Sequence, residues 1–112
     1  MSVDDVTRLR HMLEAAGEAL AFIAGRTRAD LDRDRMLALA LVKCLEIIGE
    51  AAHSVSAQTR EQVADIPWPD NVGMRHRLIH AYYDVNLNIV WKTVTEALPP
   101  LIVALRRHVP PS

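Results

Sequence analysis

The sequence has little that would direct it out of the cytoplasm or into a membrane. Its single cysteine, Cys44, cannot form a disulfide within the chain. The longest uninterrupted apolar run, Met36 to Val42, is far shorter than the ~20 residues needed to cross a bilayer. The N-terminal stretch MSVDDV is acidic, whereas a secretory signal begins with positive charge. These absences predict a cytoplasmic protein without a signal peptide or membrane span.

A surplus of charge of one sign is also lacking. The chain has 13 Lys and Arg residues against 14 Asp and Glu residues, and its net charge at pH 7 is -1. A protein that coats nucleic acid through charge alone carries a strong basic surplus. That mode of binding is excluded, so any contact with nucleic acid must come from a local group of residues.

Apolar residues at steps of three and four dominate the first half of the chain. They predict a first helix that starts near Ser2 and is ended by Gly25. A second, long helix is predicted from Asp30 to Val55. Between Leu37 and Ile48 its apolar residues nearly encircle the helix. This segment is therefore either the centre of the fold or a subunit interface.

The middle of the chain is more polar and contains helix-breaking residues. A short helix is predicted around residues 59–64, followed by a rigid break at Ile66-Pro67-Trp68-Pro69. Asp70 or Asn71 is expected to cap a third helix over roughly residues 72–83. This third helix contains the residues that suggest chemistry.

The last predicted helix spans residues 86–109, with a bend or break at Pro99-Pro100. No segment alternates apolar and polar residues, and no Asn-Gly or Asp-Gly hairpin turn occurs. The predicted fold class is therefore all-α, an up-and-down antiparallel bundle of about four to five helices. We expect one domain over residues 1–109 and a disordered tail over residues 110–112.

Aromatic residues are few, but most of them are clustered in the sequence. Four of the five lie within residues 68–91, together with Arg and His residues of the third helix. Arg pairs with phosphate and aromatic rings stack on unpaired bases, so this composition suits a phosphodiester ligand. The alternative is that Trp68 and Trp91 are core residues, as large aromatic side chains commonly are.

Helical geometry separates the charged residues of this segment into two groups. At ~100° per residue, His76, His80 and Asp84 share one face, and Arg75 lies ~140° away from His80. A site between two copies of the helix would bring both flanks together, which is a geometric hint of a dimer. A metal held by His76, His80 and Asp84 is a further alternative. We favour no metal, since a single helix would supply all the ligands.

Four segments, taken in order, resemble one known family. Met74-Arg75-His76-Arg77-Leu78-Ile79-His80-Ala81-Tyr82 resembles the R-x4-H-x-Y signature of HepT-like proteins in the HEPN superfamily, and His76 matches the polar residue that usually follows the Arg. The other segments are residues 45–52, Ile66-Pro67-Trp68 and residues 84–91. Ala81 departs from the pattern, because family members often have Gly there.

The resemblance implies a fold, an activity and two partners. It implies a helical homodimer with a cleft at the interface, acting on RNA as an endoribonuclease that uses no metal and no cofactor. It also implies the toxin half of a toxin–antitoxin pair, whose antitoxin is an MNT-type nucleotidyltransferase. In the family this partner is thought to transfer AMP to the motif tyrosine, here Tyr82.

The resemblance also gives roles to the catalytic candidates. RNA supplies its own nucleophile, the 2′-OH, so cleavage needs a proton acceptor and positive charge near the phosphate. His80 is the candidate acid or base, and Arg75 the candidate phosphate ligand. His76 is expected either to make the second proton transfer or to orient the substrate. The division of acid and base roles stays open.

Arg77, Glu50 and Tyr82 are assigned supporting or substrate-binding roles. Glu50 lies within an otherwise apolar helix, and is expected either to pair with Arg75 or Arg77 or to reach solvent at the helix edge. The hydroxyl of Tyr82 is placed to touch a phosphate or base. An AMP group on Tyr82 would add negative charge to an anion-binding cleft and so repel RNA.

Two other functions remain as alternatives. The first is a non-catalytic helical dimer that serves only as partner or substrate of a nucleotidyltransferase. The second is a metal-dependent phosphohydrolase, which would lose its activity in chelator. Whether Arg75 and His80 are needed for activity separates the first alternative from an enzyme.

Overall fold

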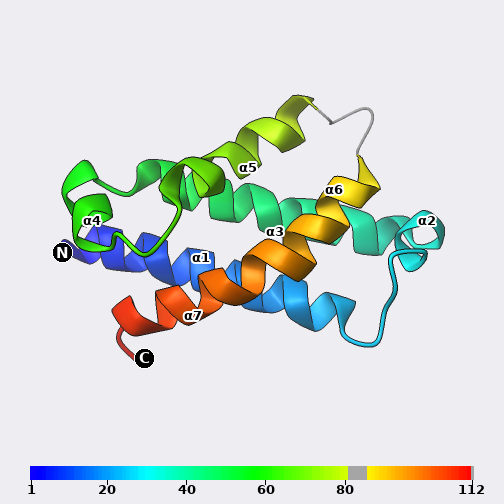
Figure 1. The fold of residues 1–112 in the computed structure, drawn as a ribbon, viewed down its shortest axis with the longest axis horizontal. Coiled ribbons are helices and arrows are strands. Elements are labelled where there is room, and N and C mark those ends of the chain that lie inside the picture. The colour runs from blue at the N-terminus through cyan, green and yellow to red at the C-terminus, as the bar shows by residue number, and fades with distance from the viewer. Residues whose placement is uncertain (81–85, 112) are drawn as a thin grey trace.

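The computed structural model describes the backbone of residues 1–80 and 86–111, and the surroundings of the side chains of residues 1–74 and 86–111. Within the described residues every regular element is a helix (Figure 1), which confirms the predicted fold class there. The elements are α1 (Val3–Ile23), α2 (Asp30–Arg33), α3 (Arg35–Ser54), α4 (Ala57–Gln62), α5 (Trp68–His80), α6 (Leu87–Lys92), the π-helix η1 (Thr93–Ala97) and α7 (Leu98–His108).

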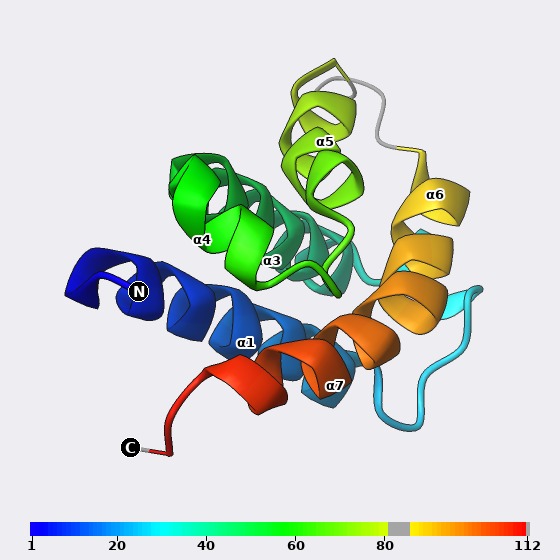
Figure 2. The ribbon, with the colours of Figure 1, turned by 60° about the vertical axis from the view of Figure 1, so that its left-hand side comes forward.

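The long helices alternate in direction. Helices α1, α3 and α5 and the continuous rod formed by α6, η1 and α7 run up and down in turn, with the short α2 and α4 at opposite ends (Figure 1). Helix α3 packs against α1 on one side and α5 on the other, and α7 packs on α1 (Figure 2). The motif helix α5 is therefore supported mainly by α3.

Helix α1 begins and ends where the sequence predicts. The side chain of Ser2 caps it by accepting a hydrogen bond of 3.1 Å from the backbone N–H of Asp5. The helix ends at Ile23, and Gly25 follows with a φ of 72°. That left-handed conformation is costly for residues with a Cβ, so glycine permits the turn.

The prediction of one helix from Asp30 to Val55 is wrong, because Asp34 interrupts it. The backbone of Asp34 is extended, with φ -122° and ψ 90°. Its carboxylate accepts a 3.0 Å hydrogen bond from the backbone N–H of Leu37. The Asp34 side chain thus caps α3, and the helix of α2 does not continue through it. An Asp side chain can compete in this way for backbone hydrogen bonds, whereas an apolar side chain cannot.

Helix α5 also starts earlier than the sequence predicts. The helix begins at Trp68, with Pro69 in its first turn, where a missing N–H costs nothing. Neither Asp70 nor Asn71 precedes it as a cap. The Asn71 side chain instead donates a 2.9 Å hydrogen bond to the carbonyl of Pro67. The predicted end near Tyr83 lies outside the described residues.

The last helix is disturbed by its prolines, but through a widened turn and not a break. Asn86 caps α6 by accepting hydrogen bonds from the backbone N–H groups of Asn88 and Ile89, at 3.1 and 3.2 Å. The chain then adopts the π-helix η1, in which Leu98 N–H bonds to the carbonyl of Thr93. Pro99 follows directly and cannot donate, so the wider turn spaces the preceding carbonyls from the proline rings.

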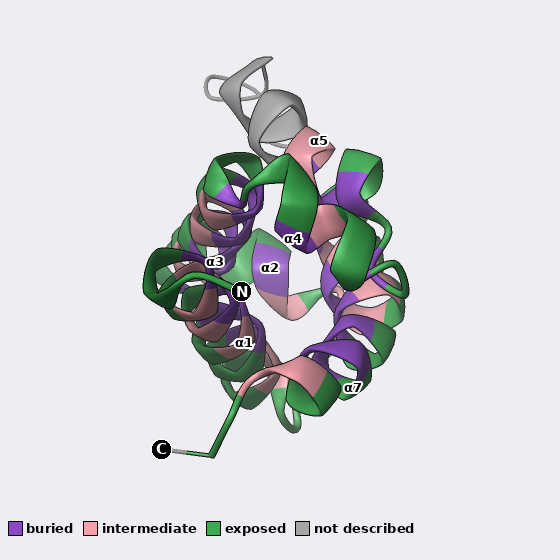
Figure 3. Ribbon diagram, turned by 90° about the vertical axis from the view of Figure 1, so that its left-hand side faces the viewer, coloured by how far each residue is buried: buried purple, intermediate pink, exposed green. Residues whose placement is uncertain are grey.

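Helix α3 is the centre of the described fold. Its inward-facing residues are buried in the hydrophobic core, and its outward-facing residues are exposed (Figure 3). Its buried apolar residues are Leu37, Ala38, Leu41, Val42, Cys44, Leu45, Ile48 and Ala52. Burial, with a smaller contribution from the charge of Glu18, raises the pKa of the Cys44 thiol. Cys44 is therefore a small core residue and not a reactive one.

Candidate functional site

The residues singled out in the sequence lie in the C-terminal half of α5. Arg75, His76 and Arg77 are helical, and His80 is the last residue of the helix. Because the backbone is helical, Arg75 and His80 are separated by about 140° around the axis and ~7.5 Å along it. The contacts of these side chains, and Tyr82 as a whole, lie outside what the structure describes. Their predicted roles therefore stay predictions.

The N-terminal end of α5 is held by Trp68. Its side chain is buried, and its indole N–H donates a 3.0 Å hydrogen bond to the carbonyl of Val63, the residue that ends α4. The prediction that Trp68 is a core residue is confirmed, and its ring is not available to stack on a base. Trp91 is half-buried against the core. Both tryptophans thus serve packing.

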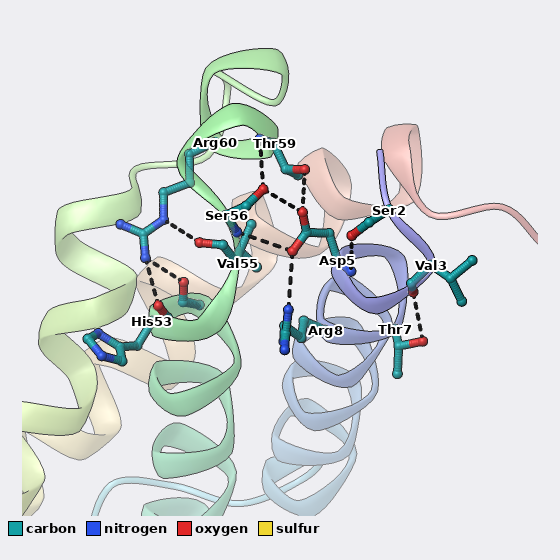
Figure 4. Close-up of polar contacts among 11 residues, drawn as sticks. Ser2, Val3, Asp5, Thr7, Arg8, His53, Val55, Ser56, Thr59 and Arg60 are labelled. Carbon is teal, nitrogen blue, oxygen red and sulfur yellow. Dashed lines mark hydrogen bonds and ion pairs between the residues drawn. The ribbon is translucent and has the colours of Figure 1, made fainter.

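Arg60 of α4 contacts both the end of α3 and the N-terminal end of α5. The sequence alone does not predict this role of Arg60. Its guanidinium donates to the carbonyls of Ala52, His53 and Val55 at 2.9, 3.0 and 3.1 Å (Figure 4). The last turn of a helix leaves such carbonyls without partners, so a cation there is favourable. The same guanidinium lies 5.7 Å from the centre of the Trp68 ring. Nothing in the local sequence of α4 indicates this role, because the partners belong to α3 and α5.

A second polar cluster lies at the start of α1, around the buried carboxylate of Asp5. It accepts hydrogen bonds from the hydroxyls of Ser56 and Thr59, both at 2.6 Å, and from the backbone N–H of Ser56 at 3.1 Å (Figure 4). Arg8 adds an ion pair at 3.4 Å. The hydrogen bond from Ser56 and then that from Thr59 lower the pKa of Asp5 strongly, against burial, which raises it. The carboxylate therefore stays ionised and fastens α1 to α4.

The C-terminal side of the motif segment is anchored as well. The Arg28 side chain donates a 2.7 Å hydrogen bond to the amide oxygen of Asn88 in α6 and forms a 3.2 Å ion pair with Asp32. The start of α6 is thereby tied to α2 and the turn before it. The Arg28 contact therefore anchors the N-terminal end of α6, as the Trp68 contacts anchor the N-terminal end of α5.

Glu50 lies on α3, and its side chain is exposed. Exposure fits the alternative in which it reaches solvent at the helix edge. Its pairing with Arg75 or Arg77 stays a prediction, because their side chains lie outside the described part.

The described residues also leave the metal alternative untested. Among them no group of three or more His, Cys, Asp or Glu side chains is arranged to hold a metal ion. The alternative site at His76, His80 and Asp84 falls outside that part of the chain. None of the described helices is long and apolar enough to cross a membrane.

Comparison with known proteins defines the family. The family model described as "Ribonuclease HepT-like" matches residues 12–108. That range contains the second half of α1 and every later helix through the end of α7. The chain therefore belongs to the HepT-like ribonuclease family, as the four motif segments predict.

Individual relatives agree with this assignment. "Putative RNase TTE0752" of Caldanaerobacter subterraneus subsp. tengcongensis is 37% identical over 93 residues, 83% of each chain. "Probable ribonuclease HepT" of Thermococcus cleftensis is 38% identical over 80% of this chain and 84% of its own length. "Putative RNase MJ1380" of Methanocaldococcus jannaschii is 33% identical over 90% of this chain and 94% of its own length. No solved structure gives a significant match.

Proposed function

We propose that this protein is a metal-independent endoribonuclease and the toxin of a HEPN/MNT toxin–antitoxin pair. One observation carries the proposal. The R-x4-H stretch of α5, with Arg75 and His80, lies inside the region that matches a ribonuclease family. The three relatives are named "Putative RNase" or "Probable ribonuclease", which supports the same activity.

In the proposed reaction the RNA supplies its own nucleophile. The 2′-oxygen forms a bond to phosphorus and gives its proton to a base, while the bond from phosphorus to the 5′-oxygen breaks and that oxygen takes a proton from an acid. His80 serves as base or acid, and His76 makes the second transfer or orients the substrate. Arg75 holds the phosphate and its developing charge. The products are a 2′,3′-cyclic phosphate and a 5′-hydroxyl.

We further propose that two copies of the chain form the site. The ~140° offset between Arg75 and His80 on one helix makes it hard for one copy to direct both at one phosphate. With a two-fold axis beside α5, one copy could direct Arg75 at the phosphate and the second copy could direct His80 at it. Sedimentation equilibrium of the purified chain tests this directly, with a dimer expected and a monomer contradicting it.

The proposed partner is a nucleotidyltransferase antitoxin that places AMP on Tyr82. The added phosphate would bring negative charge and bulk beside the residues that bind the RNA phosphate. Family membership supports this part of the proposal. A gain of one AMP by intact mass, lost in Tyr82→Phe, is the expected result when the chain is incubated with such an enzyme and ATP.

The decisive experiment is cleavage of a labelled mixed RNA in EDTA. Wild type is expected to cut and to leave cyclic-phosphate ends, whereas His80→Ala and Arg75→Ala are expected to lose activity by about 100-fold or more. His11→Ala, an exposed histidine on α1, is the matched control and should cut like wild type. If folded wild type with unmodified Tyr82 does not cut, the non-catalytic alternative replaces the enzyme.

A further inference from the structure

Helix α5 packs along α3, and its N-terminal end makes further contacts that help to set its orientation. It has 13 residues, and the motif residues lie seven to twelve positions after Trp68, which corresponds to roughly 10–18 Å along the axis. A tilt of only ~5° at Trp68 would therefore move the backbone of His80 by ~1.6 Å. A displacement of ~1 Å at reacting groups can cost ~100-fold in rate. Contacts that fix Trp68 thus contribute, together with the packing of α5 on α3, to the position of the motif.

The Arg60 side chain links Trp68 to the C-terminal end of α3. Its three hydrogen bonds end on carbonyls at the C-terminal end of α3, and its guanidinium lies over the Trp68 ring. The guanidinium is planar and forked, so its three bonds also set the plane that the indole ring packs against. The indole N–H of Trp68 donates its hydrogen bond to the carbonyl of Val63. Trp68 is therefore held from two sides, by α4 and by a cation that bridges to α3.

We propose that Arg60 is a positioning residue for the ribonuclease reaction, acting through Trp68 on the orientation of α5. This inference rests on the proposed function for its effect on cleavage, but its effect on α5 stands independently. Arg60 touches neither the substrate nor the motif in this proposal. Its loss should lower kcat and leave KM within about twofold, because misplaced reacting groups weaken the transition state more than ground-state binding.

A matched control lies next to Arg60 in the same helix. Thr59 is buried and donates its hydroxyl to Asp5, on the side of α4 that faces α1. Thr59→Ala therefore removes a buried hydrogen bond from the same helix without touching Trp68 or the carbonyls of α3. It should destabilise the fold while leaving α5 in place.

The experiment compares Arg60→Met, Arg60→Lys and Thr59→Ala at a temperature where each remains folded by circular dichroism. Arg60→Met keeps an unbranched apolar side chain but removes the guanidinium and all three hydrogen bonds, and is expected to lower kcat by about 10- to 100-fold. Arg60→Lys, which keeps the charge and loses the fork, should fall between Arg60→Met and wild type. Thr59→Ala should retain kcat within twofold.

A second measurement separates this inference from the proposed function. Backbone amide chemical shifts of residues 75–80, measured by NMR, should change in Arg60→Met and stay at wild-type values in Thr59→Ala. Unchanged shifts in Arg60→Met, or an equal loss of kcat in Thr59→Ala, would overturn the inference. If wild type itself cuts no RNA, the proposed function fails, and the amide shifts alone decide whether Arg60 orients α5.

Discussion

Two adjacent residues of α4 connect to two different regions of the molecule. Thr59 bonds to the buried Asp5 of α1, whereas Arg60 bonds to the end of α3 and covers Trp68 of α5. The first cluster is a buried anion that fastens the N-terminal helix to α4. The second is a cation that joins the central helix to the motif helix.

The comparison shows how a helix of six residues can serve both the fold and the candidate site. A helix this short has little stability of its own, so its side-chain contacts decide what it does. Loss of the Asp5 cluster should lower stability with little effect on the geometry of α5. Loss of the Arg60 contacts should change the geometry of α5 more and lower stability less. The following predictions test that division.

The largest expected effect is that of Asp5→Ala. It removes the acceptor of the Ser56 hydroxyl and of the buried Thr59 hydroxyl, and should lower the free energy of unfolding by about 3 kcal/mol. Urea unfolding at pH 7 measures the loss. Asp4→Ala is the control, since Asp4 is exposed in the same turn and should cost less than about 1 kcal/mol. Equal losses would remove the distinction between the buried cluster and an ordinary helix-start carboxylate.

The same cluster predicts a dependence of stability on pH. Hydrogen bonds from Ser56 and Thr59 lower the pKa of Asp5 in the folded chain, so its contribution is complete above the unfolded value of ~3.9 and is lost as pH falls below it. Between pH 6 and pH 2.5 wild type should lose about 2 kcal/mol more than Asp5→Asn, which has no charge to titrate. Urea midpoints at the two pH values give the difference. Parallel losses in the two proteins would place the titration elsewhere.

A smaller effect is expected at Trp68. Trp68→Phe keeps an aromatic ring beneath Arg60 but removes the indole N–H that bonds to Val63, and should destabilise the fold by about 1 kcal/mol. Because Arg60 retains a ring to cover, the amide shifts of residues 75–80 should change less than in Arg60→Met. Thermal unfolding and the same NMR spectra check both points. A larger shift in Trp68→Phe would assign the orientation of α5 to the Val63 contact instead.

The sequence predicts the helices well because their signals are local. Spacing of apolar residues, Ser2 at one end and Gly25 at the other are enough for α1. The predictions are wrong at Asp34 and at the start of α5, where a side chain competes with the backbone or where proline fits a first turn. Such competition is decided by the surrounding packing, which the local pattern does not contain.

The candidate site divides in the same way. The motif with Arg75 and His80 is read from neighbouring residues, and the family comparison agrees with the resemblance. The supports of α5 are not readable in this manner, since Arg60 meets Ala52 and Trp68 only after three helices have packed. Asp5 is likewise joined to residues more than fifty positions away. Charged residues whose partners lie on other helices need the fold before their roles are visible.

The smallest effect is expected where charged contacts are more exposed. Asp65, in the connection between α4 and α5, meets His108 at 2.9 Å and Arg107 at 3.3 Å at the end of α7. Partial burial raises the pKa of Asp65, but the hydrogen bond from His108 and the smaller contribution from Arg107 outweigh it, so the pKa is lowered. Solvent screens such a contact, and Arg107→Ala should change the free energy of unfolding by less than about 0.5 kcal/mol.

Unfolding measured at high salt is the control for the Arg107→Ala prediction. In 0.5 M NaCl the difference between Arg107→Ala and wild type should shrink further, because exposed charges are screened over a few ångströms. The loss in Asp5→Ala should hardly change, since Asp5 and its partner Thr59 are buried. Urea unfolding of both variants at low and high salt measures this. A loss in Arg107→Ala that matches Asp5→Ala and resists salt would mean that the end of α7 holds the α4–α5 connection as firmly as the buried anion holds α1.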